Sequence, residues 1–225
     1  MVRTVGDFLY LDKAISMKKF ILAAVAFCVT LTIHAQVFEG QITYANAYKS
    51  KNPQVSDQQW AKMMGDTQQY QIKGGDYRSD TNGTLMQWIL FVNKDGKLYS
   101  KMATSETVYY NDVTIQGDEV YKSELKKGTT KILGYLCDEL VLTCKNGVQK
   151  YYFNAQLGVD PKLFVNHKFG NWYDLVSRAR ALPLKSIIET TMFTLESTST
   201  QVKPAKLDPN LFVLPKGVKT EKSPY

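Results

Sequence analysis

Three short turn signals containing glycine divide much of this chain into paired segments. Gly74-Gly75, Asp95-Gly96 and Asn146-Gly147 each stand between two stretches with the composition of extended strands. Such dipeptides indicate β-hairpins, because glycine accepts the positive φ angles that tight turns require. Hairpins that follow one another along a chain build an antiparallel sheet. The sequence therefore predicts a mainly β fold with an antiparallel, meandering sheet.

Two segments break this rhythm and are predicted to be helices. In the first, Ser56 can cap the helix, Gln59 can complete a capping box, and Gly65 can end it. In the second, Asn171 is the candidate cap and Pro183 is expected to end the helix. Both helices have an apolar stripe along one face. The stripes consist of Trp60, Met63 and Met64 in the first helix and of Trp172, Leu175 and Val176 in the second.

Residues 17–35 have the layout of a secretory signal. Lys18 and Lys19 precede an apolar run, and the small residue Ala35 stands at the expected cleavage point. The apolar run is too short for a membrane helix, which needs about 20 residues. We therefore expect a cleaved signal peptide; the alternative is an uncleaved N-terminal anchor.

Residues 1–16 resemble no targeting element, so we predict that translation starts at Met17. The alternative is an unusually long basic region ahead of the signal. The exported protein is then expected to begin at Gln36 as a single domain that extends to the end of the chain. We expect no lipid anchor at Cys28, because bulky Phe27 precedes it where lipid attachment needs a small residue.

The charge of the expected mature chain is mild. Residues 1–35 hold four of the 28 basic and two of the 21 acidic residues, so the remaining 24 and 19 give a net charge of +5. The lysines are scattered along the sequence, whereas a nucleic-acid site would gather them on one face. We expect no nucleic-acid partner, and a transient attraction to an anionic membrane surface stays open.

Cys137 and Cys144 are the cysteines that remain after the predicted cleavage. If one strand holds both, seven residues separate them by roughly 23 Å, which is beyond the reach of a disulfide. Their odd spacing also places them on opposite faces of that strand. We expect two buried free thiols.

Side chains for familiar catalytic chemistry are scarce. His167 is the one histidine beyond the predicted signal, so it cannot supply the two ligands of an H-E-x-x-H zinc site. We interpret it as a loop residue just ahead of the second helix. The chain has no G-x-S-x-G and no glycine-rich phosphate-binding motif. We expect a protein that is not an enzyme and holds no cofactor or metal.

Several pieces of the chain, GDYRSD, KILGYLC, LPLK and DPNLFVLPKGV, resemble landmarks of secreted bacterial proteins in the LolA/LolB-like superfamily of periplasmic lipoprotein carriers. Many of these proteins belong to a domain family of unknown function. The resemblance covers about Val37 to Val218, and its ending is also predicted as the last strand. It implies a strongly curved antiparallel sheet, an unclosed barrel, with two or three short helices packed on its concave face. Arg78 falls in an early strand, as an arginine of the carriers does, but the resemblance assigns it no role.

The resemblance implies a periplasmic or envelope-associated carrier for a lipid, a lipidated protein or another hydrophobic ligand. The two helical stripes would then cover the concave face and bind the ligand. The alternative is an envelope protein–protein interaction module in which both stripes are core and a surface or edge strand binds the partner. The sequence leaves the ligand, the partner and the oligomeric state open.

Overall fold

The computed structural model describes residues 37–224, which form one twelve-stranded sheet. The strands are β1 (Gly40–Ser50), β2 (Thr67–Lys73), β3 (Asp76–Thr81), β4 (Met86–Val92), β5 (Lys97–Met102), β6 (Val108–Asp112), β7 (Val120–Ile132), β8 (Tyr135–Cys144), β9 (Gly147–Gly158), β10 (Ala181–Glu189), β11 (Phe193–Pro204) and β12 (Thr220–Lys222). Their order is β12-β6-β5-β4-β3-β2-β1-β11-β10-β9-β8-β7, and every neighbouring pair is antiparallel except β12 and β6. Within residues 37–224 the end strands β12 and β7 do not pair with each other, so the sheet is not closed. The prediction of a mainly β, antiparallel and unclosed sheet is confirmed.

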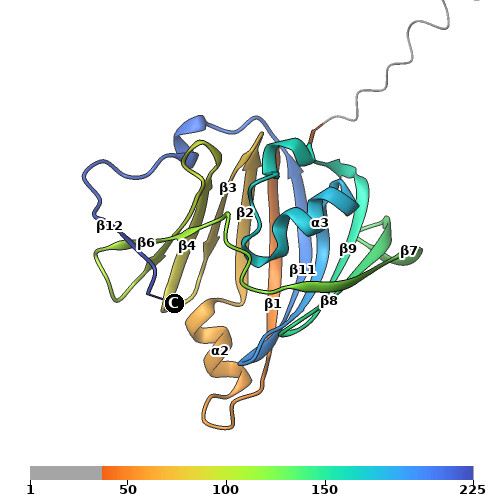
Figure 1. Cartoon of the computed structure of the whole chain (residues 1–225), viewed down its shortest axis with the longest axis horizontal. Coiled ribbons are helices and arrows are strands. Elements are labelled where there is room, and N and C mark those ends of the chain that lie inside the picture. The colour runs from red at the N-terminus through yellow and green to blue at the C-terminus, as the bar shows by residue number, and fades with distance from the viewer. Residues whose placement is uncertain (1–36, 225) are drawn as a thin grey trace, which may run out of the picture. The chain divides into compact units, whose positions relative to one another are not determined.

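Within residues 37–224, two α-helices and four short 3-10 helices accompany the sheet. They are α2 (Asp57–Met64), α3 (Trp172–Ala179), η1 (Asn93–Asp95), η2 (Pro161–Phe164), η3 (Phe169–Asn171) and η4 (Pro209–Phe212). The sheet curves around α3 and the 3-10 helices that precede it (Figure 1). We call the sheet face turned toward α3 the inner face.

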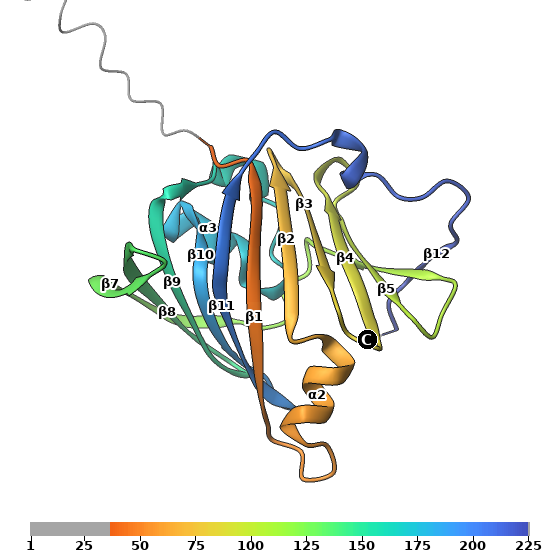
Figure 2. The ribbon, with the colours of Figure 1, turned by 180° about the vertical axis from the view of Figure 1, so that it is seen from behind.

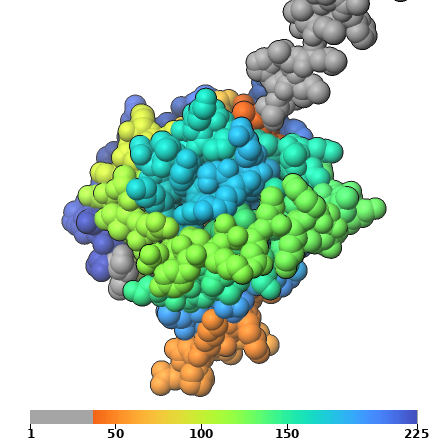
Figure 3. All heavy atoms as spheres, turned by 45° about the vertical axis from the view of Figure 1, so that its right-hand side comes forward, coloured from red at the N-terminus to blue at the C-terminus, as the bar shows by residue number. Residues whose placement is uncertain are grey.

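The segment 159–180 supplies most of the packing against the inner face. Phe164, Leu175 and Val176 are at most 1% exposed and belong to the main apolar cluster of the fold. In Figure 3 the atoms of this segment, coloured cyan to blue, fill the space between the strands. The inner face is therefore mostly filled by the chain's own side chains.

Helix α2 forms as predicted, but it does not lie over the concave face of the sheet, where it was expected. Ser56 accepts a hydrogen bond from the amide of Gln59, and the Gln59 side chain accepts one from the amide of Ser56, which completes the capping box. The helix lies at one end of the sheet beside β1, not over the inner face (Figures 1 and 2). The amides of Thr84 and Leu85 bond to its last turn. The expectation that two or three helices cover the concave face is therefore wrong for α2, because an apolar stripe shows that a helix packs but not where.

Helix α3 begins directly after Asn171, as predicted, but it ends earlier than predicted. Asn171 precedes it with a φ of 59° and makes no capping bond with its side chain. That side chain is buried and donates to Gln149 Oε1 at 3.3 Å. The helix ends at Ala179, where Arg180 turns left-handed, and Pro183 already lies in β10. Asn171 therefore occupies the predicted cap position but does not cap the helix with its side chain, which is bound to Gln149 instead.

The three predicted hairpins are present. Gly74-Gly75 joins β2 to β3, since Lys73 pairs directly with Asp76. β4 and β5 are joined through η1 and Gly96, which has a φ of 59°. β8 and β9 are joined by a two-residue turn, but its residues are Lys145 and Asn146 rather than the predicted Asn146 and Gly147, because Gly147 already pairs with Cys144.

The prediction of a last strand near residue 208 is wrong. Where the last strand was expected, Asp208 and Pro209 begin the helix η4, and the Asp208 carboxylate accepts the amide of Asn210. Phe212 then joins a smaller apolar cluster on the outer face of the sheet, opposite to α3. The other buried members of this cluster are Leu90, Val92, Tyr99 and Val108. Beyond it, β12 pairs with β6 in the tail.

Both cysteines are free and buried. Both belong to the main apolar cluster. β8 pairs with β9 without a register shift from Asp138 to Cys144, and the shift near Cys137 adds residues to β7 and not to β8, so the odd spacing keeps the two cysteines on opposite faces of the strand.

The predicted signal peptide, its start at Met17 and its cleavage before Gln36 lie outside the described residues. Within residues 37–224, neither α-helix reaches the length and apolarity that would let it cross a membrane.

Candidate functional site

A cavity of about 220 Å³ lies between Trp172, at the start of α3, and the inner face of the sheet. Four aromatic side chains line it together with two aliphatic ones: Tyr44, Tyr70, Tyr151, Trp172, Ile188 and Leu195. Gln68, Ser186 and Ser197 add polar groups to the lining. The cavity is therefore mainly aromatic, with a few polar groups, which is the usual composition of a small-molecule site.

Strand alternation brings these side chains to one place. Tyr44 belongs to the same alternation as Phe38 and Ile42, whose side chains are also buried. Its cross-strand partner on β2 is Gln68, and Tyr151 on β9 pairs with Ser186 on β10. Residues that pair directly across neighbouring strands share a face of the sheet. The lining thus comes from five strands, β1 and β2 near the start of the described chain and β9, β10 and β11 in its second half.

The turn before α3 places the indole ring over the cavity. Gly170 and Asn171 have φ values of 62° and 59°, both in the left-handed region. An added Cβ at Gly170 would meet no atom within 4 Å, so the backbone conformation alone is the reason for glycine there. Trp172 then packs against Tyr70 and Tyr77, at centroid distances of 6.3 and 5.3 Å.

Two hydrogen-bond donors beside the cavity are buried and have no partner among residues 37–224, the Tyr70 hydroxyl and Trp172 Nε1. The other two tyrosines are satisfied, since Tyr44 donates to the carbonyl of Pro183 at 2.6 Å and Tyr151 to Gln149 Oε1 at 3.0 Å. Burial raises the pKa of the Tyr70 hydroxyl well above its ordinary value, so it stays a neutral donor. Leaving a buried donor unpaired costs about 1–3 kcal/mol, and a ligand acceptor would recover part of that cost.

Behind Trp172 lies a buried histidine. His167 is 2% exposed, and its Nε2 lies 2.8 Å from the hydroxyl of Tyr77. Its ring stacks on Tyr77 and contacts Phe91 at 4.4 Å between centroids. Burial lowers the pKa of His167 to about 4. Its position in a loop just ahead of the helix was predicted, whereas its burial was not.

Of the six residues predicted to bind ligand, Trp172 lines this cavity. Leu175 and Val176 are fully buried in the core instead. Trp60 lies on α2, where its ring contacts Phe193 at 4.7 Å and its Nε1 donates to Ser50 Oγ at 3.2 Å. Met63 and Met64 share that helix and do not line the cavity. The structure does not bring the two stripes together at one site.

Sequence reasoning missed the tyrosines of the lining. Tyr44 belongs to the alternating pattern that predicts the first strand, and this pattern indicates that its side chain points to the buried face. Nothing in the local sequence shows that Tyr70 and Tyr151, on strands that are not neighbours, face each other across one cavity.

Arg78 lies away from this site. It forms an ion pair with Asp80, with Nη2 and Oδ1 2.7 Å apart, and its guanidinium lies 5.1 Å from the ring centre of Trp88. Its neighbour Tyr77 points to the inner face, so Arg78 points to the outer face.

The part of the chain from 37 to 224 holds no cluster of three or more histidine, cysteine or acidic side chains placed for a metal. The cavity's chemistry is apolar contact plus neutral hydrogen-bond donors. This arrangement suits a ligand that is hydrophobic and carries an acceptor.

Comparisons with known proteins add little to this. No family model matches the chain, and no curated protein matches it. Among solved structures, the crystal structure of LprF from Mycobacterium bovis is 10% identical, with a TM-score of 0.32, and the match covers 76% of this chain and 88% of that chain. A likeness at this level carries no argument about function.

Proposed function

We propose that the protein is an exported, non-enzymatic binding or carrier protein of the periplasm or cell envelope, with a lipid, a lipidated protein or another hydrophobic molecule as its ligand. The observation that carries this proposal is the aromatic cavity beneath Trp172 with its two unpaired buried donors. The signal-like segment 17–35 supports export.

The size of the cavity limits the part of the ligand that it holds. An engineered apolar cavity of about 150 Å³ binds benzene. A cavity of about 220 Å³ is therefore suited to one ring or to the end of one acyl chain. The donors of Tyr70 and Trp172 would be satisfied by an ester, carboxylate or amide oxygen on that group.

A second function is favoured by a different observation. The inner face is largely filled by segment 159–180, and β7, at the end of the sheet, is exposed along most of its 13 residues. Exposed edge strands can pair with an extended segment of another protein. The chain would then act as an envelope interaction module.

A titration with octanoate separates the two functions. We expect saturable quenching of tryptophan fluorescence by octanoate in the wild type. Ser186→Phe, which places a ring in the cavity, should weaken binding by about tenfold or more, equivalent to about 1.4 kcal/mol. Trp172→Phe should remove most of the fluorescence change, because Trp60 and Trp88 lie elsewhere in the fold.

Met63→Ala on α2 is the matched control and should bind octanoate as the wild type does. The carrier proposal fails if the wild type shows no saturable binding, or if Ser186→Phe binds with unchanged affinity. The interaction module would then be the better account.

A further inference from the structure

The turn at the tip of the β7–β8 hairpin contains a residue that such turns disfavour. Ile132 pairs with Tyr135, so Leu133 and Gly134 form a two-residue turn. Both have positive φ values, 49° at Leu133 and 85° at Gly134. Turns of this kind favour asparagine or glycine at these positions, because a bulky side chain is strained there. Leu133 is also 48% exposed, so neither the turn nor the core explains a leucine at this position.

Exposed apolar side chains concentrate on the same hairpin. Nine large apolar side chains are exposed in the part of the chain that the structure describes, and four of them belong to β7, to β8 or to the turn between them. These four are Tyr121, Leu125, Leu133 and Leu136. Leu133 and Leu136 border one surface hollow, so they lie close together at the tip. The hairpin projects beyond the rest of the sheet (Figures 1 and 2), and exposed apolar side chains gathered on such an element mark a contact surface.

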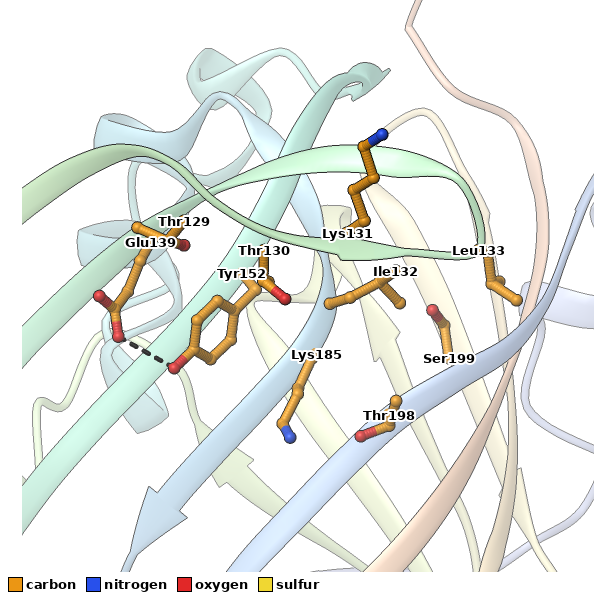
Figure 4. Close-up of a pocket in the computed structure, with 10 residues that line it drawn as sticks. All are labelled: Thr129, Thr130, Lys131, Ile132, Leu133, Glu139, Tyr152, Lys185, Thr198 and Ser199. Atoms are coloured by element: carbon orange, nitrogen blue, oxygen red, sulfur yellow. Dashed lines mark hydrogen bonds between the residues drawn. The ribbon is translucent and has the colours of Figure 1, made fainter.

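The tip is held against the body of the fold. Ile132 is buried and belongs to the main apolar cluster. Asn154 on β9 donates a hydrogen bond to the carbonyl of Leu136 at 2.7 Å. In Figure 4 Ile132 lies between the hairpin and strands β10 and β11, whereas Leu133 stands at the turn and the amino group of Lys131 points away from these strands. The tip therefore presents Leu133 to solvent from an anchored position.

The solvent side of the hairpin is basic. β7 carries four lysines and one glutamate. β8 adds two acidic side chains, but both are turned toward the protein. Asp138 is 25% exposed and is bound to Lys127, which is 75% exposed. Glu139 is 12% exposed and lies 3.5 Å from Lys126, which is 56% exposed. Beside the turn, Lys131 is exposed, and the ion pairs among residues 37–224 do not involve it.

We propose that the β7–β8 hairpin docks the protein on an anionic lipid surface, with Leu133 and Leu136 in the interfacial layer and the lysines of β7 at the headgroups. Apolar side chains flanked by lysines are typical of segments that bind at the surface of an anionic membrane. Lysine is depleted at protein–protein interfaces, so a protein partner fits this composition less well. The residues of the tip do not line the cavity beneath Trp172, and the proposal does not rest on the ligand of that cavity.

Co-sedimentation with lipid vesicles tests the proposal. The protein purified from its cell envelope is mixed with vesicles of phosphatidylcholine alone or of equal parts phosphatidylcholine and phosphatidylglycerol. We expect binding to the anionic vesicles to be at least about tenfold tighter than to the neutral ones, because several lysines contribute. Binding should weaken in about 1 M NaCl, where the Debye length falls to about 3 Å.

Leu133→Asn separates membrane contact from folding. Asparagine tolerates the φ of 49° better than leucine does, so the urea midpoint should stay unchanged or rise. Loss of the apolar side chain should weaken binding to the anionic vesicles by about tenfold. Met192→Asn is the matched control, because Met192 is a similarly exposed apolar residue between β10 and β11. This variant should bind as the wild type does.

Lys131→Gln tests the charge at the tip. It removes one exposed lysine beside the turn and should weaken binding to the anionic vesicles by about fivefold. Lys94→Gln changes the net charge by the same amount, but Lys94 lies on η1, between β4 and β5. We expect this control to bind as the wild type does, whereas an effect of total charge alone would weaken both variants equally.

Three results would overturn the proposal. The first is that the wild type does not sediment with the anionic vesicles, and a protein partner captured through the hairpin in that case would assign the surface to protein contact instead. The second is equal binding to neutral and anionic vesicles. The third is that Leu133→Asn or Lys131→Gln binds as tightly as the wild type, or no more weakly than its control.

Discussion

Replacing Leu175 with alanine is expected to lower the free energy of unfolding by about 2–5 kcal/mol, the usual loss for a large core side chain. Leu175 is fully buried between α3 and the sheet, in the main apolar cluster. The truncation removes apolar burial and leaves a cavity that the curved sheet cannot readily close. Urea unfolding of the wild type and the variant measures the difference.

Met63→Ala is the matched control for this experiment. Met63 lies on an apolar stripe of the other helix, but α2 has no fully buried residue. We expect a loss of about 1 kcal/mol, near the average for point substitutions. Equal losses at the two positions would contradict the assignment of α3 to the core and of α2 to the end of the sheet.

Stability is also expected to fall as the pH drops from 6.5 to 4, because of His167. Burial holds the pKa of the folded side chain at about 4, whereas an unfolded histidine titrates near 6.5. Between these values the unfolded chain binds a proton that the folded protein does not, so acid favours unfolding. The loss is negligible at about pH 7.5 and above, and it reaches about 3 kcal/mol at pH 4.

His167→Gln isolates this effect, because glutamine stays neutral throughout and can still bond to the Tyr77 hydroxyl. Carboxylates that titrate below pH 5, such as Glu39, whose hydrogen bond to Lys73 lowers its pKa, act equally on both proteins. Urea unfolding at intervals from pH 7 to 4 should show a shallower decline for the variant. Parallel curves would contradict the burial of a neutral imidazole.

The sequence predicted what depends on neighbouring residues. The capping box of Ser56 and Gln59 and the turn at Gly74-Gly75 are local arrangements, and both formed as expected. The prediction of a last strand was wrong for a reason that is also local, because Asp208 and Pro209 begin a short helix. Local chemistry thus accounts for these elements, including the one that was misjudged.

The sequence could not predict where elements meet. The stripes of α2 and α3 looked alike, yet one packs at the end of the sheet and the other inside its curve. Asparagine commonly caps helices, but the Asn171 side chain binds Gln149, which lies on a strand distant in sequence, instead of a helix amide. The cavity was missed for the same reason, since Tyr44, Tyr70 and Tyr151 meet only through the pairing of the sheet.

Native mass spectrometry of the protein purified from its own cell envelope tests most directly whether the cavity beneath Trp172 holds a hydrophobic ligand. We predict a bound species with the mass of a lipid or another apolar molecule, released by organic solvent. The same preparation of Ser186→Phe, with its cavity filled, should lack this species. A clean mass of the unliganded protein for the wild type, or an equal amount of bound molecule in the variant, would contradict the account.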